Sequence, residues 1–348
     1  MKKSIAALAA SAIAIGLSAC GGSSNASSST ASSGSASASS GAVSTEGIKV
    51  AYASALDPND VADQFGLQAA KAKVQTLNDD SAVIAGLQRG SIDVGNVDFD
   101  QAAAAVAKGM PIKIIYAAQT TPEYVLVGNP NVATLNDLAG KKVGYQGPGS
   151  QTEIFVKNLV KQKVPAIASK VQFVSLAESS RRAQAMVANH LDVSSLESVN
   201  YAQLKKQGNY HLLGSWSDLA GGAGQAIGTA WITTDAQYAK DGKRLTAFVK
   251  DLQRGYNETY KDKNAWVALA KKTLPDVDAS LFPAVYDVYI SRKMYPQAGT
   301  PALTPTVWTA NEKFWRGIGE WSKPLDSSLI AFDLVQAGAA ETATTTAG

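Results

Sequence analysis

The sequence contains little of the chemistry that many enzymes and metal proteins require. Among its 348 residues there is one cysteine, Cys20, and there are two histidines, His190 and His211. One cysteine excludes an intramolecular disulfide and a cysteine-rich metal cluster. Two histidines leave little for histidine-based catalysis or zinc binding. We therefore expect neither a metal site nor a cofactor.

Strong charge and long apolar runs are also lacking. Only 18% of the residues are charged, and 32 basic residues against 29 acidic ones give a net charge of +3. This balance argues against a nucleic-acid partner. After residue 20 no apolar stretch approaches the ~18 residues of a transmembrane helix. The length exceeds the ~250–300 residues at which a single core stops growing, so two lobes are expected.

The N-terminus has the pattern of an export signal. Lys2 and Lys3 precede an apolar run over residues 5–16, which predicts a signal peptide over residues 1–19. Its end, Leu17-Ser18-Ala19-Cys20, resembles the bacterial lipobox. The resemblance implies cleavage before Cys20, lipidation of Cys20, and anchoring on the extracytoplasmic face of a membrane. The alternative is an ordinary signal peptide with an incidental cysteine.

Composition divides the rest of the chain into a body and two low-complexity ends. Residues 20–46 are almost wholly Ser, Ala and Gly, which predicts a disordered tether, and residues 337–348 predict a disordered tail. Between them, short β-branched runs alternate with helical patterns. This alternation predicts an α/β fold with parallel sheet covered by helices on both faces.

The expected elements can be placed along the body. We expect strands at 48–52, 92–94, 112–116, 124–127, 142–145, 171–175, 192–195 and 210–213, and a strand that ends at Trp231. Between these strands the pattern predicts helices over residues 81–90, from 98 or 100 to 107, 151–162 and 181–188. Beyond Asp235 it predicts helices at 241–260, 264–273, 279–290 and 306–321. Most of the tryptophans in this region are expected to pack in the core.

Three segments together carry a family resemblance. They are Gly86-Leu87-Gln88-Arg89-Gly90-Ser91-Ile92-Asp93-Val94-Gly95, then Leu135-Asn136-Asp137-Leu138-Ala139-Gly140-Lys141-Lys142-Val143-Gly144, then Arg182-Ala183-Gln184-Ala185-Met186-Val187-Ala188-Asn189-His190-Leu191-Asp192-Val193. Their order and spacing are similar to those of the solute-binding proteins of ABC importers, in the nitrate, sulfonate, taurine and thiamine-precursor group. The resemblance implies a hinged, two-lobed periplasmic-binding-protein fold of type II with mixed, mostly parallel sheets. Lobe one would hold residues 47–120 and 222–336, and lobe two residues 121–221.

The resemblance also implies a function. The protein would be a monomer that captures a small solute between its lobes and delivers it to permease subunits driven by a cytoplasmic ATPase. The solute would be nitrate-like, sulfonate-like, taurine-like or aromatic, and the protein would not be an enzyme. Two alternatives on the same fold are a thiamine-pyrimidine-synthase-like enzyme and a sensory ligand-binding module.

Candidate ligand contacts follow from the expected strand ends, because ligands bind outside the carboxyl ends of strands in open sheets. The loop over residues 147–152 is the leading candidate, since glycines permit close approach and its hydroxyl and amide groups can surround a polar ligand. Asp98 and Glu197 are each either ligand contacts or helix caps. Arg181 and Arg182 are interpreted as a solvated helix face. The full set of candidates is Ser54, Asn96, Asp98, Phe99, Gln119, Thr120, Gly149, Ser150, Gln151, Thr152, Glu178, Glu197 and Trp231.

The charge of the solute stays open at this point. Residues 122–216 carry ten basic and six acidic residues, a net charge of +4, which favours an anion. Acidic Asp98 and Glu197 in the cleft would favour a cationic or hydrogen-bonding solute instead.

Overall fold

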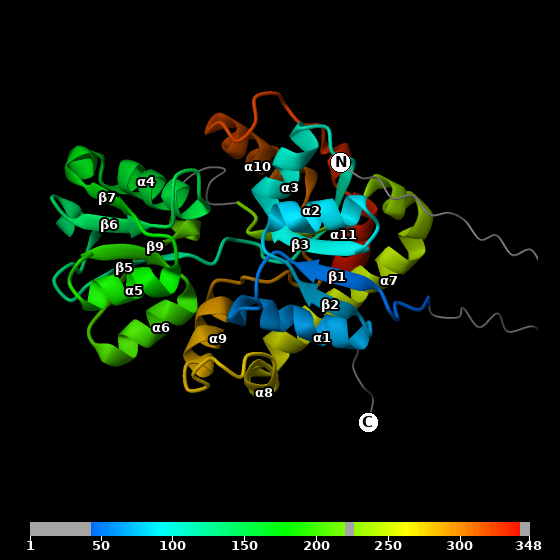
Figure 1. Cartoon of the computed structure of the whole chain (residues 1–348), viewed down its shortest axis with the longest axis horizontal. Coiled ribbons are helices and arrows are strands. Elements are labelled where there is room, and N and C mark those ends of the chain that lie inside the picture. The colour runs from blue at the N-terminus through cyan, green and yellow to red at the C-terminus, as the bar shows by residue number, and fades with distance from the viewer. Residues whose placement is uncertain (1–42, 220–225, 342–348) are drawn as a thin grey trace, which may run out of the picture. The chain divides into compact units, whose positions relative to one another are not determined.

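The structure is a computed structural model that describes residues 43–219 and 226–341 (Figure 1). The expected signal peptide, Cys20 and most of the expected tether and tail lie outside these residues. At both ends the ordered body extends beyond the expected limits. Thr45 is buried, and its hydroxyl donates to the Asp251 carboxylate at 3.0 Å. The last helix, α11 (Phe332–Ala339), continues into the segment that was expected to be disordered.

The first sheet combines strands from two distant parts of the chain. Its order is β2 (Lys73–Thr76), β1 (Lys49–Tyr52), β3 (Val94–Asp98), β10 (Thr229–Thr234) and β4 (Ile112–Ala117). β1 is parallel to β2 and β3, whereas β10 is antiparallel to β3 and β4. Because β10 lies between β3 and β4, the first and last parts of the chain form one lobe.

The second sheet lies wholly within the middle of the chain. Its order is β7 (Gln172–Ser175), β6 (Lys142–Tyr145), β8 (Val193–Leu196), β5 (Val125–Gly128) and β9 (His211–Ser215). β6 is parallel to β7 and β8, and β5 is antiparallel to β8 and β9. The two sheets thus have the same pairing pattern, with one antiparallel strand in the fourth position of each.

Helices cover both faces of the second sheet. The helices of this lobe are α4 (Gln151–Lys163), α5 (Ser179–Val187) and α6 (Ser198–Gln207). Figure 1 shows α4 on one side of these strands, and α5 and α6 on the other. Apolar residues of α4, such as Phe155, belong to the main core, whereas Ala183, Met186 and Leu204 of α5 and α6 form a smaller core with Val125 and Val127 of β5.

The other lobe carries helices from both ends of the body. They are α1 (Val61–Ala69), α2 (Asp80–Gln88), α3 (Phe99–Ala107), α7 (Asp235–Lys261), α8 (Lys263–Thr273), α9 (Phe282–Ser291), α10 (Pro305–Gly317) and α11. Short 3₁₀ helices cover Pro58–Asp60, Leu135–Leu138, Pro165–Lys170, Trp216–Asp218 and Ser327–Leu329. α1 packs against α7 through Gly66 and Gly255. A Cβ on Gly66 would lie 2.6 Å from the Asp251 carbonyl oxygen, so this crossing requires glycine.

The structure confirms a two-lobed α/β fold with mixed sheets. Within the described ranges, parallel and antiparallel pairs are equal in number, so the sheets are less parallel than predicted. The strand expected at 92–94 begins at Val94 and runs on to Asp98, which places Asn96 inside the strand. Helices α1, α6 and α11 and strand β2 were not predicted. No helix in residues 43–219 and 226–341 combines the length and the apolarity that a membrane crossing needs.

Candidate ligand-binding cleft

A cavity of about 690 Å³ lies between the two sheets. One wall comes from the ends of β1 and β3 and from the loop after β1. The other wall comes from the loops after β6, β7 and β8 and from α6. The parallel strands β1, β3, β6 and β8 all direct their carboxyl ends toward it, which is the usual position for a ligand in open α/β sheets. Its volume is within the range of small-molecule sites.

The cavity walls are strongly acidic. The lining contains a single basic residue, Arg182, and nine carboxylates from both lobes and the crossover between them: Asp57, Asp60, Asp80, Asp98, Glu123, Glu178, Glu197, Asp276 and Asp278. Two of these carboxylates lie at the exposed rim and have basic partners. Glu178 pairs with Arg181 at 3.1 Å, and Asp278 pairs with Lys206 at 3.3 Å.

Three carboxylates line the cavity where the lobes meet. Asp57 follows β1, Glu123 lies in the crossover, and Glu197 follows β8. Burial, followed by repulsion from Asp57, raises the pKa of Glu197 to about 7, although Arg182 opposes the shift. Burial and then repulsion from Glu197 and Asp57 raise the pKa of Glu123 well above its usual range. The three groups are therefore close enough to repel each other when all are ionised.

A second acidic group lies at the end of β3. Asp80 at the start of α2 accepts a hydrogen bond from the Asp98 backbone N–H at 3.1 Å. Burial and then repulsion from Asp80 and Asp100 raise the pKa of Asp98, and burial raises the pKa of Asp80 to about 6. Within the described chain, the carboxylates of Asp98 and Glu197 accept no hydrogen bond. Asp98 is thus the last residue of β3 and the N-cap of α3 by position, but its side chain does not cap the helix.

A further buried carboxylate lies behind the wall formed by Tyr52. Asp63 accepts hydrogen bonds from the hydroxyls of Tyr256 at 2.7 Å and Tyr52 at 3.0 Å. Burial raises the pKa of Asp63 to about 7, although both hydroxyls oppose the shift. Tyr256 in turn accepts a hydrogen bond from the Trp231 indole at 3.1 Å. This network fixes the orientation of Tyr52 in the cavity wall.

Arg182 has a structural function in the second lobe. Its side chain is buried, and it donates hydrogen bonds to the carbonyl oxygens of Ser195 at 2.9 Å, Leu176 at 2.9 Å and Ala177 at 2.6 Å. The interpretation of Arg182 as part of a solvated helix face is wrong, because three backbone carbonyls replace water around the guanidinium. Arg181, one residue earlier, is exposed as expected.

Amide side chains in the cavity walls have unused hydrogen-bonding atoms. Asn96 is 4% exposed and Asn200 is 8% exposed. Nδ2 of Asn96 and Oδ1 of Asn200 have no partner among residues 43–219 and 226–341, and neither has Oδ1 of Asn59. The Asn59 amide nitrogen donates to Glu123 at 3.1 Å, which orients its oxygen. Buried polar atoms are nearly always paired, so these three atoms are available for hydrogen bonds to a ligand in the cavity.

The structure brings six of the predicted site residues into the cavity lining: Ser54, Asn96, Asp98, Gln119, Glu178 and Glu197. Others lie elsewhere. Phe99 is buried against Trp308, and Trp231 is buried in the core against Tyr52 and Phe248. The Thr120 hydroxyl donates to the Lys293 carbonyl at 2.7 Å, so it joins the crossover to the end of α9 instead of facing the cavity.

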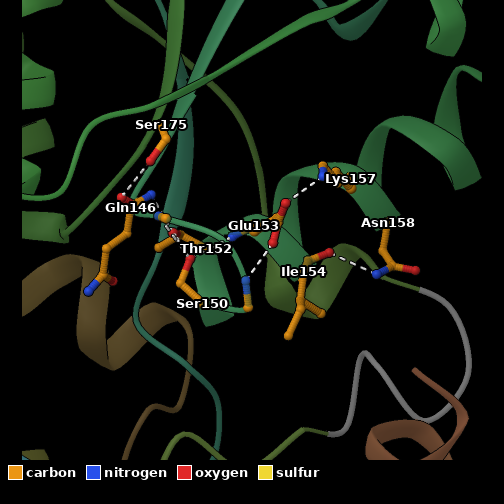
Figure 2. A network of polar contacts seen from close by, with 10 residues as sticks. Gln146, Ser150, Thr152, Glu153, Ile154, Lys157, Asn158 and Ser175 are labelled. Atoms are coloured by element: carbon orange, nitrogen blue, oxygen red, sulfur yellow. Dashed lines mark hydrogen bonds and ion pairs between the residues drawn. The ribbon is translucent and has the colours of Figure 1, made fainter. Parts of the chain in front are cut away.

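The loop predicted as the leading candidate is absent from the lining. Figure 2 shows that its polar groups bond within the loop and to α4. The Ser150 hydroxyl accepts from the Glu153 N–H at 3.2 Å, the Thr152 hydroxyl accepts from the Gln146 N–H at 2.8 Å, and the Gly149 N–H donates to the Glu153 carboxylate at 2.7 Å. Gln151 instead reaches the other lobe, where it donates to Asp100 at 2.6 Å. From this region only Gln146 lines the cavity, and its side chain extends away from the network in Figure 2.

Sequence reasoning did not identify Asp57, Asp80, Glu123 or Asn200. The signal for Asp57 was present, since it lies in the polar segment directly after β1. Asn200 lies in the first turn of α6, three residues after the N-cap residue Glu197. Glu123 follows Pro122 in the crossover between the lobes, three residues beyond the predicted contact Thr120.

Comparison with known proteins gives the family. The family model described as NMT1/THI5 like matches residues 65–265, which is more than half of the chain. The chain belongs to the NMT1/THI5-like family. A search of curated proteins finds no significant match.

Solved structures agree with the NMT1/THI5-like assignment at the level of the fold. The chain is similar to the ligand-binding component of an ABC-type import system from Staphylococcus aureus, which was solved with zinc bound. The TM-score is 0.66 at 14% identity, over 85% of this chain and 99% of that one. It is also similar to the periplasmic aliphatic sulphonate-binding protein SsuA from Escherichia coli, with a TM-score of 0.64 at 17% identity, over 81% and 95% of the two chains.

Proposed function

We propose that this NMT1/THI5-like protein is the solute-binding component of an ABC importer. It would capture a small solute between its two lobes and present the closed form to permease subunits that a cytoplasmic ATPase drives. The observation that carries this proposal is the cavity between the sheets, whose walls come from both lobes. A ligand that contacts both walls favours the closed arrangement, because only that arrangement offers all of its contacts.

Two contacts between the lobes support a closing motion. On one flank Gln151 of α4 donates to Asp100 of α3 at 2.6 Å. On the other flank Lys206 of α6 approaches Asp278, before α9, at 3.3 Å. Neither of these two contacts is covalent or apolar, so both can break when the lobes separate. Trp216 also packs against Phe314 and Trp315 of α10, which forms an aromatic contact near the crossover. The crossover is held separately, since Arg292 donates to the Pro122 carbonyl at 2.7 Å.

The NMT1/THI5-like family also has enzyme members, so the alternative is that this protein is an enzyme. The residues that line the cavity bear on that alternative. Neither His190 nor His211 contributes to the lining within the described ranges, which instead consists largely of carboxylates and amides. We therefore propose binding and release of an unchanged solute. Recovery of a chemically altered compound after incubation with the purified protein would contradict this.

We further propose that Cys20 is lipidated and holds the body at the extracytoplasmic face of a membrane. The support is the sequence Leu17-Ser18-Ala19-Cys20 after the apolar run. In the native host, the wild-type protein is expected in the membrane fraction with an acylated N-terminal cysteine detectable by mass spectrometry. Cys20→Ala is expected to abolish the modification. An unmodified Cys20 in the wild type would contradict the lipid anchor.

Lobe closure tests the binding function. Spin labels on exposed positions of the two lobes, such as Lys161 and Lys108, report the distance between them while solutes of all charge classes are added. We expect a binding solute to narrow and shorten the distance distribution. A solute that stabilises the protein without any change in this distribution would contradict the clamp. Uptake of the same solute is then compared between cells that contain the protein and cells that lack it. Import predicts that uptake depends on the protein, whereas a sensory role does not.

A further inference from the structure

We infer that the solute is a small organic cation, held between carboxylates of both lobes and by the unpartnered amides of Asn96 and Asn200. The inference rests on the proposed solute-binding function and names the chemical class of its ligand. It differs from the anion that the net positive charge of the second lobe favoured.

The first step of the argument is the placement of charge. Asp57 and Glu197 approach the cavity from opposite lobes, Glu123 lies between them in the crossover, and Asp98 lies at the end of β3. The carboxylates of Asp98 and Glu197 accept no hydrogen bond from the described part of the chain. The basic side chains near them are already used by the protein. Arg182 donates to three carbonyls, and Arg292 donates to the carbonyls of Pro122 and Glu123.

The second step concerns the amide groups, which are independent of charge. Asn96 offers an N–H donor, and Asn200 offers a carbonyl acceptor. Both side chains are more than nine-tenths buried and line the cavity. A ligand that satisfies both atoms carries at least one acceptor and at least one donor. Organic ammonium, amidinium and guanidinium compounds with a hydroxyl or carbonyl group have this combination.

The third step is the size and lining of the cavity. In the described residues, no group of three or more His, Cys, Asp or Glu side chains is placed to hold a metal ion. The cavity of about 690 Å³ is also lined by Tyr52, Tyr124, Val97 and Leu281. Aromatic faces attract organic cations, and aliphatic side chains bury their carbon atoms. The lining therefore fits an organic cation better than a bare ion.

A cation also accounts for closure. The Asp57 and Glu197 carboxylates repel each other across the cleft when both are ionised, as does each with Glu123. A positive charge between them converts this repulsion into attraction from both lobes. An anion in the same place would add to the repulsion.

The test compares matched ligands on the full-length protein by thermal unfolding and calorimetry at pH 7.5. The pairs are choline with its neutral isostere 3,3-dimethylbutan-1-ol, tyramine with 2-(4-hydroxyphenyl)ethanol, and ethanolamine with ethylene glycol. Nitrate, taurine and ethanesulfonate represent the other charge classes. We expect at least one cation to stabilise the protein and its partner compound to bind at least ~10-fold more weakly.

Variants locate the effect. Glu197→Gln and Asp98→Asn remove charge while they retain shape, and each is expected to weaken binding of the cation at least ~10-fold. The control Glu258→Gln removes an exposed carboxylate of α7 outside the cavity and is expected to change binding less than ~2-fold. Without ligand, Glu197→Gln is expected to raise the unfolding temperature at pH 7.5, because repulsion is relieved.

The outcomes separate this inference from the proposed function. If nitrate or ethanesulfonate binds with lobe closure, the proposed solute-binding function is supported and the inference that the solute is a cation is wrong. If no cation binds, or if Glu197→Gln lowers the unfolding temperature of the free protein, the cation is also wrong. If a cation binds and the distance between the lobes does not change, the inference of a cationic solute is supported and the proposed closing of the lobes is wrong.

Discussion

The two lobes share one sheet pattern but contribute different chemistry to the cleft. In both sheets the second strand, β1 or β6, is parallel to its two neighbours, and the fourth strand, β10 or β5, which follows a crossover between the lobes, is antiparallel to its neighbours. The first lobe contributes carboxylates directly after β1 and at the end of β3. The second lobe contributes Glu197 and, at the exposed rim, Glu178, together with the buried Arg182 and Asn200. Equivalent topology therefore fixes where a ligand binds, and the loops decide which ligand it is.

The comparison also separates overall charge from local charge. The second lobe has a net charge of +4 over residues 122–216, yet Arg182 is its one basic residue in the cavity lining. Other basic residues of this lobe, such as Lys157 and Lys206, are partly exposed and pair with carboxylates outside the cavity or at its rim. Net charge of a lobe thus describes its outer surface, where water screens it.

The largest expected effect tests whether Arg182 is structural. Arg182→Met removes three hydrogen bonds to carbonyl oxygens and the cation nearest to Glu197, so we expect the free energy of unfolding to fall by about 2–4 kcal/mol. Denaturant unfolding followed by tryptophan fluorescence measures this. Arg181→Met is the matched control, because Arg181 is exposed and pairs only with exposed Glu178, and its effect is expected to stay below about 0.5 kcal/mol.

The same pair of variants tests whether the second lobe uses Arg182 for structure or for ligand binding. If Arg182 held an anion, Arg182→Met would abolish ligand binding and leave stability nearly unchanged. We expect the reverse: a less stable protein that still prefers cations over their neutral isosteres. Equal losses of stability in Arg181→Met and Arg182→Met would contradict the structural function.

A smaller effect is expected from pH. The pKa values of Asp63 and Glu197 are raised to about 7 and that of Asp80 to about 6, mainly by burial. A carboxyl with a raised folded-state pKa contributes stability that is fully present below its unfolded pKa of ~4 and is lost as pH rises through the folded value. We therefore expect the unfolding temperature of the free protein to increase by at least ~3 °C from pH 7.5 to pH 5.5.

Measurements of cation affinity and of carboxylate variants over the same pH interval test the cause of this pH dependence. Affinity for a cation is expected to fall over the same interval, because protonation removes the charges that hold it. Asp80→Asn removes the contribution of a first-lobe carboxylate to the pH dependence of stability, and Glu197→Gln removes that of a second-lobe carboxylate. Asp326 lies outside the cavity lining and its pKa is lowered mainly by a hydrogen bond from the Ser328 N–H, so it titrates below this window and Asp326→Asn serves as the control substitution. A stability that decreases from pH 7.5 to pH 5.5 would contradict the burial of these carboxylates.

The sequence predicted the fold better than the site, and particular residues explain why. Strand and helix alternation located the buried strands, because β4 is a run of apolar, β-branched residues that only a sheet interior accommodates. The loop after β6 had the composition of a ligand loop, but the Ser150 hydroxyl caps α4 and the Thr152 hydroxyl accepts from the Gln146 N–H. Ser150 illustrates the difficulty, since the same side chain serves as a cap or as a ligand contact, and only its partners in space distinguish the two.

Glu123 and Arg182 show the other limit of sequence reasoning. Glu123 is brought to the cavity by the crossover, whose path depends on contacts with Tyr289 and Arg292 about 170 residues away. Arg182 is buried because the loop after β7 directs two carbonyl groups at it. Such long-range contacts leave no local pattern in composition or periodicity.

The smallest expected effect comes from two polar contacts between the lobes, Gln151 with Asp100 and Lys206 with Asp278, which differ in burial. Gln151→Ala removes a buried hydrogen bond to the Asp100 carboxylate, and we expect ~5-fold weaker ligand binding, since hydrogen bonds to charged groups contribute more than neutral ones. Lys206→Ala removes an exposed ion pair with Asp278, and we expect less than ~2-fold, because water competes for both charges. Calorimetric titration with the best cation of the panel measures both. If Lys206→Ala has the larger effect, the exposed flank holds the lobes together and the buried one does not. If neither variant changes affinity, these two polar contacts do not contribute to closure, and the attraction between the lobes comes from the bound cation together with the packing of Trp216 on α10.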